Sequence, residues 1–241
     1  MEELIQAIIK YSIIGFKMLL HLKGIIFDMD GVLVDSMPSH SRAWQLAFEN
    51  VTNIQVESKL IYKNEGRRGM ELVREILATK NIYVADISII EKIVRKKSEI
   101  FKDIGSFKLF PGVKKLISSL PCRKAVVSGS TKSDVFNIIN HSFGNKIFDV
   151  LVTADDIANG KPNPMPFIKA LQELDLEAEN ALVVENAPLG VLASINAGIE
   201  CIVTLNNTPL SYDDFKPMIS NHRIFSNLKS ANKILINWCV K

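Results

Sequence analysis

The chain has 241 residues, of which 47% are hydrophobic, and its 29 Lys and Arg against 26 Asp and Glu give a net charge of +3. A chain of this length and apolar content can bury a sizeable core, which excludes a mainly disordered protein. The charges are nearly balanced and scattered, which argues against nucleic acid or an anionic membrane as the main partner and leaves room for a small anionic ligand.

The amino-terminal stretch is rich in apolar residues from 5 to 22, but the basic residues Lys10, Lys17 and His21 interrupt it. A membrane span needs about 20 consecutive apolar residues, and a signal peptide needs a cleavage region, which this stretch lacks. We therefore predict an amphipathic helix over 1–21, packed on the body of the protein, and no stable membrane insertion. A helix that binds a surface is the alternative.

Short apolar runs closed by polar or glycine residues are typical of strands in a buried parallel sheet. The predicted strands are 24–27, 124–127, 150–152, 181–184 and 201–205. The helical stretches predicted between these strands are 113–120, 133–140, 166–174 and 189–197. Gly198 is predicted as the C-cap of the last one. This alternation predicts an α/β fold, a doubly wound parallel sheet in a Rossmann-like three-layer sandwich.

The segment 38–108, between the first two strands, breaks the alternation because it is helical in pattern throughout, with periodic stretches at 41–48, 68–79 and 87–101. We predict an inserted all-α cap domain over 38–108, and a core domain formed by 22–37 and 109–241. Because the insertion follows the first strand directly, it should cover the carboxyl ends of the strands, where open α/β sheets bind ligands. A lid over the binding site is the expected arrangement.

The three cysteines, Cys122, Cys201 and Cys239, lie far apart and form no C-x-x-C pair. Such spacing indicates neither a disulfide framework nor a zinc site. A reducing cytoplasmic location is the expectation that follows.

The first strand ends in two carboxylates, Asp28 and Asp30, which point to the same side of an extended chain. Their mutual repulsion is costly unless a cation, a proton or a reaction compensates for it, so they indicate an active site. The alternative is an ordinary D-x-D-G turn, in which Asp accepts local backbone hydrogen bonds and Gly31 takes a positive φ.

The other predicted strand ends also bring polar groups to the same edge of the sheet. The second strand stops at Ser128-Gly129-Ser130, whose hydroxyl and amide groups suit an anion, although simple helix capping explains them equally well. Lys161 lies between Gly160 and Pro162 and is either part of the site or a solvated loop residue. The fourth strand runs into Glu185-Asn186, just before a helix.

Together these residues resemble the four motifs of the haloacid dehalogenase superfamily, in the branch whose cap follows the first motif. The matching motifs are Asp28-Met29-Asp30-Gly31-Val32, Ser128-Gly129-Ser130, Lys161-Pro162 and Glu185-Asn186-Ala187-Pro188-Leu189-Gly190-Val191. The resemblance spans about residues 22–205, and the order and spacing of the four motifs make the set specific. Asp35-Ser36, His40 and Ala43-Trp44 further resemble the β-phosphoglucomutase-like group, which contains mutases and many metabolite phosphatases.

The resemblance implies a role for each residue. Asp28 would be the nucleophile that forms an aspartyl phosphate, and Asp30 would protonate the leaving oxygen and later deprotonate water. Lys161 and Ser128, with the amides of Gly129 and Ser130, would hold the transferring phosphoryl group. The implied Mg²⁺ ligands are Asp28, the backbone carbonyl of Asp30, Glu185 and Asn186.

One position departs from the family pattern, because Asn186 stands where the family usually has an aspartate. The three carboxylates Asp28, Asp30 and Glu185 then give −3 against +2 from Mg²⁺ and +1 from Lys161, a neutral site rather than one of charge −1. We expect weaker Mg²⁺ binding and weaker repulsion of an anionic substrate. The alternative is a decayed site.

Specificity should depend on the cap, because the catalytic residues contact only the phosphoryl group. Arg67 and Arg68, in a glycine-flanked turn, are candidates for binding a carboxylate or second phosphate, or else are solvated or paired with Glu71. His40 is a candidate proton shuttle or polar substrate contact, with a structural histidine as the alternative. Trp44 and Phe48, spaced i, i+4, are predicted to belong to the cap core.

The sequence therefore predicts a cytoplasmic Mg²⁺-dependent phosphatase that hydrolyses a small phosphorylated metabolite, such as a sugar phosphate, through an aspartyl phosphate. A β-phosphoglucomutase-type phosphotransferase is the main alternative, since it differs only in whether water or a sugar hydroxyl accepts the phosphoryl group. A non-enzymatic protein that binds a partner through its amino-terminal helix is the third hypothesis.

Overall fold

The computed structural model describes residues 22–83, 86–105, 107–144, 146–220 and 223–239. The predicted amino-terminal helix over 1–21 lies outside the described residues. None of the helices in the described ranges has the length and apolar content that a bilayer crossing requires.

A six-stranded parallel sheet in the order β3-β2-β1-β4-β5-β6 forms the centre of the fold. Its strands are β1 (Gly24–Asp28), β2 (Arg123–Val127), β3 (Val150–Val152), β4 (Ala181–Glu185), β5 (Glu200–Thr204) and β6 (Ile224–Phe225). Strand β1 lies inside the sheet, with β2 and β3 on one side and β4 to β6 on the other, which confirms the doubly wound parallel sheet. The central strands are fully buried, as their continuous apolar runs require.

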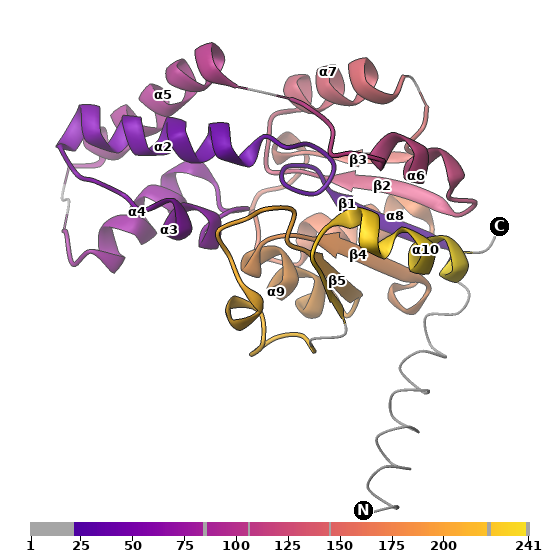
Figure 1. The fold of residues 1–241 in the computed structure, drawn as a ribbon. Helices are drawn as coiled ribbons and strands as arrows, with labels where there is room; N and C mark the ends of the chain where they lie inside the picture. Colours follow the sequence, from indigo (N-terminus) through magenta and orange to yellow (C-terminus); the bar gives the residue numbers. More distant parts are fainter. Residues whose placement is uncertain (1–21, 84–85, 106, 145, 221–222, 240–241) are drawn as a thin grey trace, which may run out of the picture.

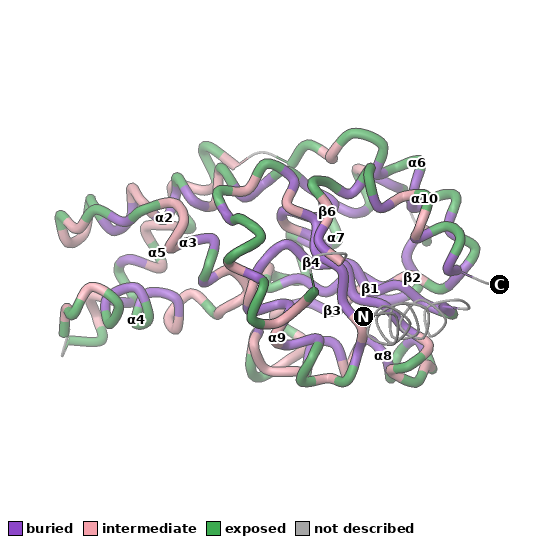
Figure 2. Tube along the Cα trace, turned by 60° about the horizontal axis from the view of Figure 1, so that its bottom comes forward, coloured by how far each residue is buried: buried purple, intermediate pink, exposed green. Residues whose placement is uncertain are grey.

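Helices cover both faces of the sheet and complete the three-layer sandwich (Figure 1). One face packs against α6 (Val113–Ser119), α7 (Lys132–Phe143) and α10 (Leu228–Trp238), and the other against α8 (Met165–Leu174) and α9 (Pro188–Asn196). Because side chains alternate along a strand, Ile25 and Phe27 of β1 join the first of these apolar clusters and Ile26 joins the second. The strands are buried between helices whose outer faces are exposed (Figure 2).

Four further helices lie together beside the carboxyl ends of the strands: α2 (Met37–Thr52), α3 (Ser58–Lys63), α4 (Gly69–Thr79) and α5 (Ile87–Ile104). They share an apolar cluster of their own, in which Trp44 and Phe48 are buried, as the sequence predicts for these two aromatic residues. No strand interrupts 37–104 where the structure describes it. We call α2–α5 and their connections the helical insertion; its boundaries as a separate domain, 38–108, stay a prediction.

The predicted strands and helices of the core agree with the structure to within one to three residues at each end, and β3 agrees at both ends. The sequence pattern missed α3, β6 and α10. Helix α3 has only six residues and β6 only two, too few to establish a period. The C-cap of α9 is Ala197, and Gly198, with φ +72°, is the next residue, a position at which a left-handed glycine commonly ends a helix.

The expectation of no disulfide is wrong, because the structure joins Cys122 to Cys239 across 117 residues of sequence. The fold brings them together: Cys122 directly precedes β2, and Cys239 follows α10, which packs against α6, with a Cα–Cα distance of 5.4 Å. Such long-range proximity is invisible in cysteine spacing. The cysteine pattern consequently no longer supports the expected reducing location, while Cys201 is free and buried.

Candidate active site

Three neighbouring strands deliver the first site residues to one edge of the sheet. Asp28 is the last residue of β1 and is paired with Val127, the residue directly before Ser128 at the end of β2. Glu185 is the last residue of β4, which lies on the other side of β1. Because all three strands are parallel, their carboxyl ends meet at this edge, as the sequence analysis assumed.

Lys161 bridges the two carboxylates that end β1 and β4. Its Nζ donates to Asp28 Oδ1 and, at 2.5 Å, to Glu185 Oε1, and all three side chains are buried. Glu185 Oε2 accepts from the backbone N–H groups of Asn186 and Ala187 at 2.8 and 3.1 Å. Every oxygen of Glu185 thus has a partner, so this carboxylate holds the lysine in place beside Asp28.

Gly190 provides the room for that arrangement. A Cβ atom at this position would collide with the Glu185 carboxylate, so the first turn of α9 can approach β4 only without a side chain here.

Burial and charge oppose each other within this cluster. Burial raises the pKa of Asp28 well above its usual value, as do the charges of Glu185 and Asp30, while Lys161 lowers it. Burial also disfavours the charged form of Lys161, but Asp28 and Glu185 outweigh it and hold the pKa of the ammonium above its usual range. Lys161 is therefore a fixed positive charge beside Asp28.

Asp30 lies at the same edge but in a different setting. Its Oδ1 accepts from Ser36 Oγ, and its Oδ2 lies 3.3 Å from Ser128 Oγ and 3.4 Å from Ser130 Oγ. Burial opposes ionisation, but hydrogen bonding with His40 and Ser36 lowers the pKa of Asp30 to about 2. With no substrate near it, Asp30 is thus an ionised carboxylate that can accept a proton.

His40 links Asp30 to the helical insertion. Its Nε2 is 3.5 Å from Asp30 Oδ1, its Nδ1 is 3.0 Å from Lys97 Nζ, and its ring stacks on Phe101 at 4.0 Å between centroids. Burial lowers the pKa of His40, and a charged lysine can only donate, so the neutral ring accepts at Nδ1 and carries its proton on Nε2, facing Asp30. Burial likewise lowers the pKa of Lys97 to about 8.

Glu65 is a site residue that the sequence analysis missed. It follows α3 in the helical insertion, and its Oε2 accepts from Asn186 Nδ2 at 3.0 Å. Burial raises the pKa of its carboxyl well above the usual value, and the charges of Asp28 and Glu185 raise it further. A carboxylate from the insertion therefore lies beside the position where the family usually has an aspartate.

Two oxygens at this edge are left without a partner. Asp28 Oδ2 and Asn186 Oδ1 are buried and make no hydrogen bond within the described ranges. An unpaired buried oxygen is costly, and a hard cation such as Mg²⁺ would compensate for both. No cluster of three or more His, Cys, Asp and Glu in the described parts of the chain has a metal-binding arrangement, so amide and backbone carbonyl oxygens would have to complete a ligand set. The donors present fit Mg²⁺.

The two predicted arginines lie in different places. Arg67 lines the cavity beside the site and is held by Asn64 Oδ1 at 3.0 Å and by Glu75 at 3.6 Å. Arg68 donates to the carbonyl of Ala158 at 2.7 Å and is not among the cavity-lining residues. Arg67 thus stays a candidate substrate contact, while Arg68 joins the insertion to the core in this structure.

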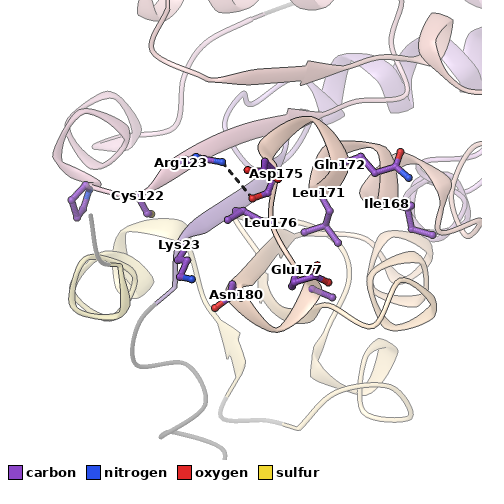
Figure 3. A pocket seen from close by; sticks show the side chains of 12 residues that line it. Lys23, Cys122, Arg123, Ile168, Leu171, Gln172, Asp175, Leu176, Glu177 and Asn180 are labelled. Carbon is purple, nitrogen blue, oxygen red and sulfur yellow. Dashed lines mark hydrogen bonds between the residues drawn. The ribbon is translucent and has the colours of Figure 1, made fainter.

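The site opens into a cavity of about 620 Å³ between the core and the helical insertion. The core contributes Asp28, Asp30, Gly129, Ser130, Thr131, Asp134 and Ile138 to its lining, and the insertion contributes His40, Trp44, Glu65, Arg67, Lys97 and Phe101 among others. A larger cavity of about 740 Å³ lies at the opposite, amino-terminal edge of the sheet, around Lys23, Arg123 and Asn180 (Figure 3). None of the predicted site residues lines this second cavity.

Comparisons with known proteins identify the family of the chain. Residues 25–204 match the family of haloacid dehalogenase-like hydrolases. The chain is 32% identical to hexitol phosphatase A of Escherichia coli, over 78% of this chain and 84% of that protein. It is 27% identical to the phosphorylated carbohydrates phosphatase of Thermotoga maritima, over 75% of this chain and 84% of that protein.

Solved structures show the same fold. A Bacteroides vulgatus protein described as a candidate beta-phosphoglucomutase superposes with a TM-score of 0.80 at 32% identity, covering 91% of this chain and 89% of its own. CbbY from Rhodobacter sphaeroides, solved with phosphate, superposes with a TM-score of 0.67 at 22% identity, covering 90% and 99%. With a family match over most of its length, the chain belongs to the haloacid dehalogenase-like hydrolases.

Proposed function

We propose that this protein is a phosphatase that hydrolyses the phosphate monoester of a small metabolite, with Asp28 as the nucleophile. The observation that supports this most directly is the shared lysine: Lys161 donates to both Asp28 and Glu185, and Asp28 lines the cavity. A buried cation fixed beside a carboxylate offsets the repulsion between that carboxylate and an incoming phosphate anion.

The reaction would proceed in two displacements at phosphorus. In the first, an oxygen of Asp28 forms a bond to phosphorus, the bond to the ester oxygen breaks, and Asp30, which would take up a proton when the anionic substrate lies beside it, gives that proton to the ester oxygen. In the second, water attacks the aspartyl phosphate, Asp30 takes its proton, and Asp28 and inorganic phosphate are released. Ser128, which lies 3.3 Å from Asp30, and the amides of Gly129 and Ser130, which line the cavity, would bind the phosphoryl oxygens.

Asp28 Oδ2, the Asp30 carbonyl and Asn186 Oδ1 would hold Mg²⁺, with Glu65 close to Asn186. The bound ion would supply positive charge to the phosphoryl group and to the carboxylates around it. The pKa of Glu65 is raised, and in its neutral form Glu65 leaves the site at the zero charge expected from the sequence. Ionised beside the bound cation, it would bring Asp28, Asp30, Glu185 and Glu65 to −4 against +3 from Lys161 and Mg²⁺, a charge of −1.

We infer a phosphorylated sugar or sugar alcohol as the substrate class, since two relatives are named for hexitols and phosphorylated carbohydrates. Arg67 and Lys97 line the cavity and can donate to polar groups of such a substrate. The predicted roles of these residues and the cytoplasmic location stay predictions.

Hydrolysis of an aryl phosphate by the purified protein, with and without millimolar Mg²⁺, tests the proposal, with Asp28→Asn as the control. Release of phosphate that needs both Mg²⁺ and Asp28 supports a phosphatase. If the protein releases none, or if the variant releases as much as the wild type, the proposal is wrong. A panel of sugar phosphates and sugar-alcohol phosphates would then identify the substrate.

A mutase is the second candidate, favoured by the likeness to the Bacteroides vulgatus structure. The chemistry at Asp28 is shared, and the outcome depends on whether a sugar hydroxyl or water reaches the aspartyl phosphate. Incubation with β-glucose 1-phosphate and a trace of the bisphosphate separates the two. Rapid isomer formation with little release of phosphate would identify a mutase.

A further inference from the structure

One carboxylate of the core holds two lysines of α3. Lys59 Nζ lies 2.9 Å from Asp214 Oδ2, and Lys63 Nζ lies 2.9 Å from Asp214 Oδ1. The lysines are spaced i, i+4 and so project from the same face of the helix. Asp214 ends the 3₁₀ turn η3 (Tyr212–Asp214), which follows β5 in the core. We call these three residues the clasp.

Hydrogen bonds within the core hold the Asp214 side chain in place independently of the two lysines. Its Oδ2 accepts from the backbone N–H of Ser211 at 2.8 Å and from Ser211 Oγ at 3.1 Å, and its side chain is only 7% exposed. Burial opposes its ionisation, but hydrogen bonds from Lys63, Ser211 and Lys59 outweigh it and hold the pKa below its usual range. An ordinary surface ion pair is weak because both partners move freely in water. The Asp214 carboxylate is already held by Ser211, so less conformational freedom is lost when it pairs with the lysines.

Helix α3 leads directly into the candidate active site. Two residues after Lys63, Glu65 contacts Asn186 in the core, and Arg68 donates to the carbonyl of Ala158. Gly66 approaches the Lys161 side chain so closely that a Cβ atom there would lie 2.9 Å from it. The segment 58–68 therefore touches the core on both sides of Glu65, and the clasp is its contact most distant from the site.

Apolar packing provides the competing explanation for how α3 is held. Tyr62 is buried in an apolar cluster of the core that also contains Leu210 and Phe215, whereas most buried apolar residues of the insertion form a separate cluster. If Tyr62 alone anchors the segment, the lysines contribute nothing to its position. The clasp and the tyrosine can be separated by experiment, because the lysine head groups are about half exposed and can be changed without disturbing the packing.

We propose that Lys59 and Lys63 are positioning residues, which hold the segment 58–68 over the active site by their joint ion pair with Asp214. Loss of the clasp lowers the fraction of molecules in which Glu65 and Arg67 face the cavity. A ligand that binds only this arrangement is then bound more weakly in proportion to that fraction. The effect on catalysis rests on the proposed phosphatase function, but the effect on the segment itself does not.

The test is the double variant Lys59→Gln/Lys63→Gln, measured first by hydrogen–deuterium exchange. We expect amides of 58–68 to exchange about 3-fold to 10-fold faster than in the wild type, with exchange in β1 and β4 unchanged. In the phosphatase assay, KM for the aryl phosphate should rise by the factor by which the competent fraction falls, while kcat changes less than about 2-fold. Added salt should raise KM of the wild type by a larger factor than KM of the variant, because both proteins bind an anionic substrate but only the wild type has the clasp.

Lys216→Gln/Lys229→Gln is the matched control, because it also removes two positive charges. Lys216 pairs with Asp213 on the same turn η3, at 2.6 Å, but both residues belong to the core, and Lys229 lies on α10. This control should exchange like the wild type. If the clasp variant and the control exchange alike over 58–68, Tyr62 alone holds the segment and the proposal is overturned. Because exchange is measured without substrate, a protein that hydrolyses nothing still decides the question.

Discussion

The two edges of the same sheet differ in how deeply their charged groups are buried. Strands β1 and β2 begin at the 740 Å³ cavity and end at the 620 Å³ cavity. At the amino-terminal edge, Arg123 donates to the backbone carbonyls of Leu174 and Asp175 and lies partly in solvent. At the carboxyl-terminal edge, Lys161 is buried with two carboxylates. The larger cavity therefore does not identify the reactive edge; the buried charges do.

The energetic cost explains why this difference is informative. Removing an ion from water costs several kcal/mol even when it is paired, and a well-packed apolar group of similar volume often stabilises a fold better. The exposed charges at the amino-terminal edge avoid that cost. The buried charges around Lys161 do not, and they leave Asp28 Oδ2 without a partner. Such an arrangement is retained where it serves a reaction.

The largest expected effect is that of Asp28→Asn at the carboxyl-terminal edge. An amide is not a competent nucleophile, so kcat/KM for the aryl phosphate should fall by at least about 10³-fold. Phosphate release by the two purified proteins, compared at equal folded content by circular dichroism, measures this. A variant with a tenth of wild-type activity would place the nucleophile elsewhere.

Lys161→Met should damage both activity and stability. It leaves Asp28 and Glu185 buried together without a cation, which costs about 3–5 kcal/mol in the free energy of unfolding. The loss of a fixed charge beside the phosphoryl group should lower kcat by about 10²–10³-fold. Urea unfolding and the aryl phosphate assay provide the two readings. If the free energy of unfolding did not change, Asp28 and Glu185 would have to be protonated or solvated. That result would contradict the buried cluster that these two carboxylates form with Lys161.

Glu65→Gln should have a smaller effect, which is mainly on the affinity for Mg²⁺. The substitution keeps the shape of the side chain and replaces a carboxyl group that would ionise beside a bound cation with a neutral amide next to Asn186. Residues that support metal ligands change metal affinity by about 10–100-fold, so the Mg²⁺ concentration for half-maximal activity should rise about 10-fold. Thermal shift on titration with Mg²⁺ provides a reading independent of turnover. Equal Mg²⁺ dependence in the variant and the wild type would remove Glu65 from the metal environment.

The sheet was predictable because its signals are local. Continuous apolar runs locate the strands, and the polar residues after them mark the edge where Asp28 and Glu185 meet. Helix α10 also has a local signal, since Leu228, Ala231, Leu235 and Trp238 repeat at helical spacing after Asn227, but the sequence analysis did not extend to it. Helix α3 is too short to show a period.

The residues that were missed depend on contacts between distant parts of the chain. Glu65 and Asn186 are 121 residues apart, and nothing in the turn around Glu65 indicates its direction. The one signal for Glu65 in the sequence was that position 186 lacks the carboxylate usual in the family, which suggests that another part of the chain supplies one. The clasp and the disulfide between Cys122 and Cys239 are equally non-local, because topology brings their partners together and spacing does not.

The smallest expected effect, at the amino-terminal edge, completes the comparison. Arg123→Gln removes a charge from the larger cavity and the hydrogen bonds to two carbonyls, which should cost about 1 kcal/mol in the free energy of unfolding. Its kcat and KM should stay within about 2-fold of wild type, because no group at that edge contacts the reacting atoms. Since Lys161→Met also removes one positive charge, the pair of variants compares the two edges directly. If Arg123→Gln reduces activity as much as Lys161→Met, chemistry is not confined to the carboxyl-terminal edge, and the larger cavity must take part in it.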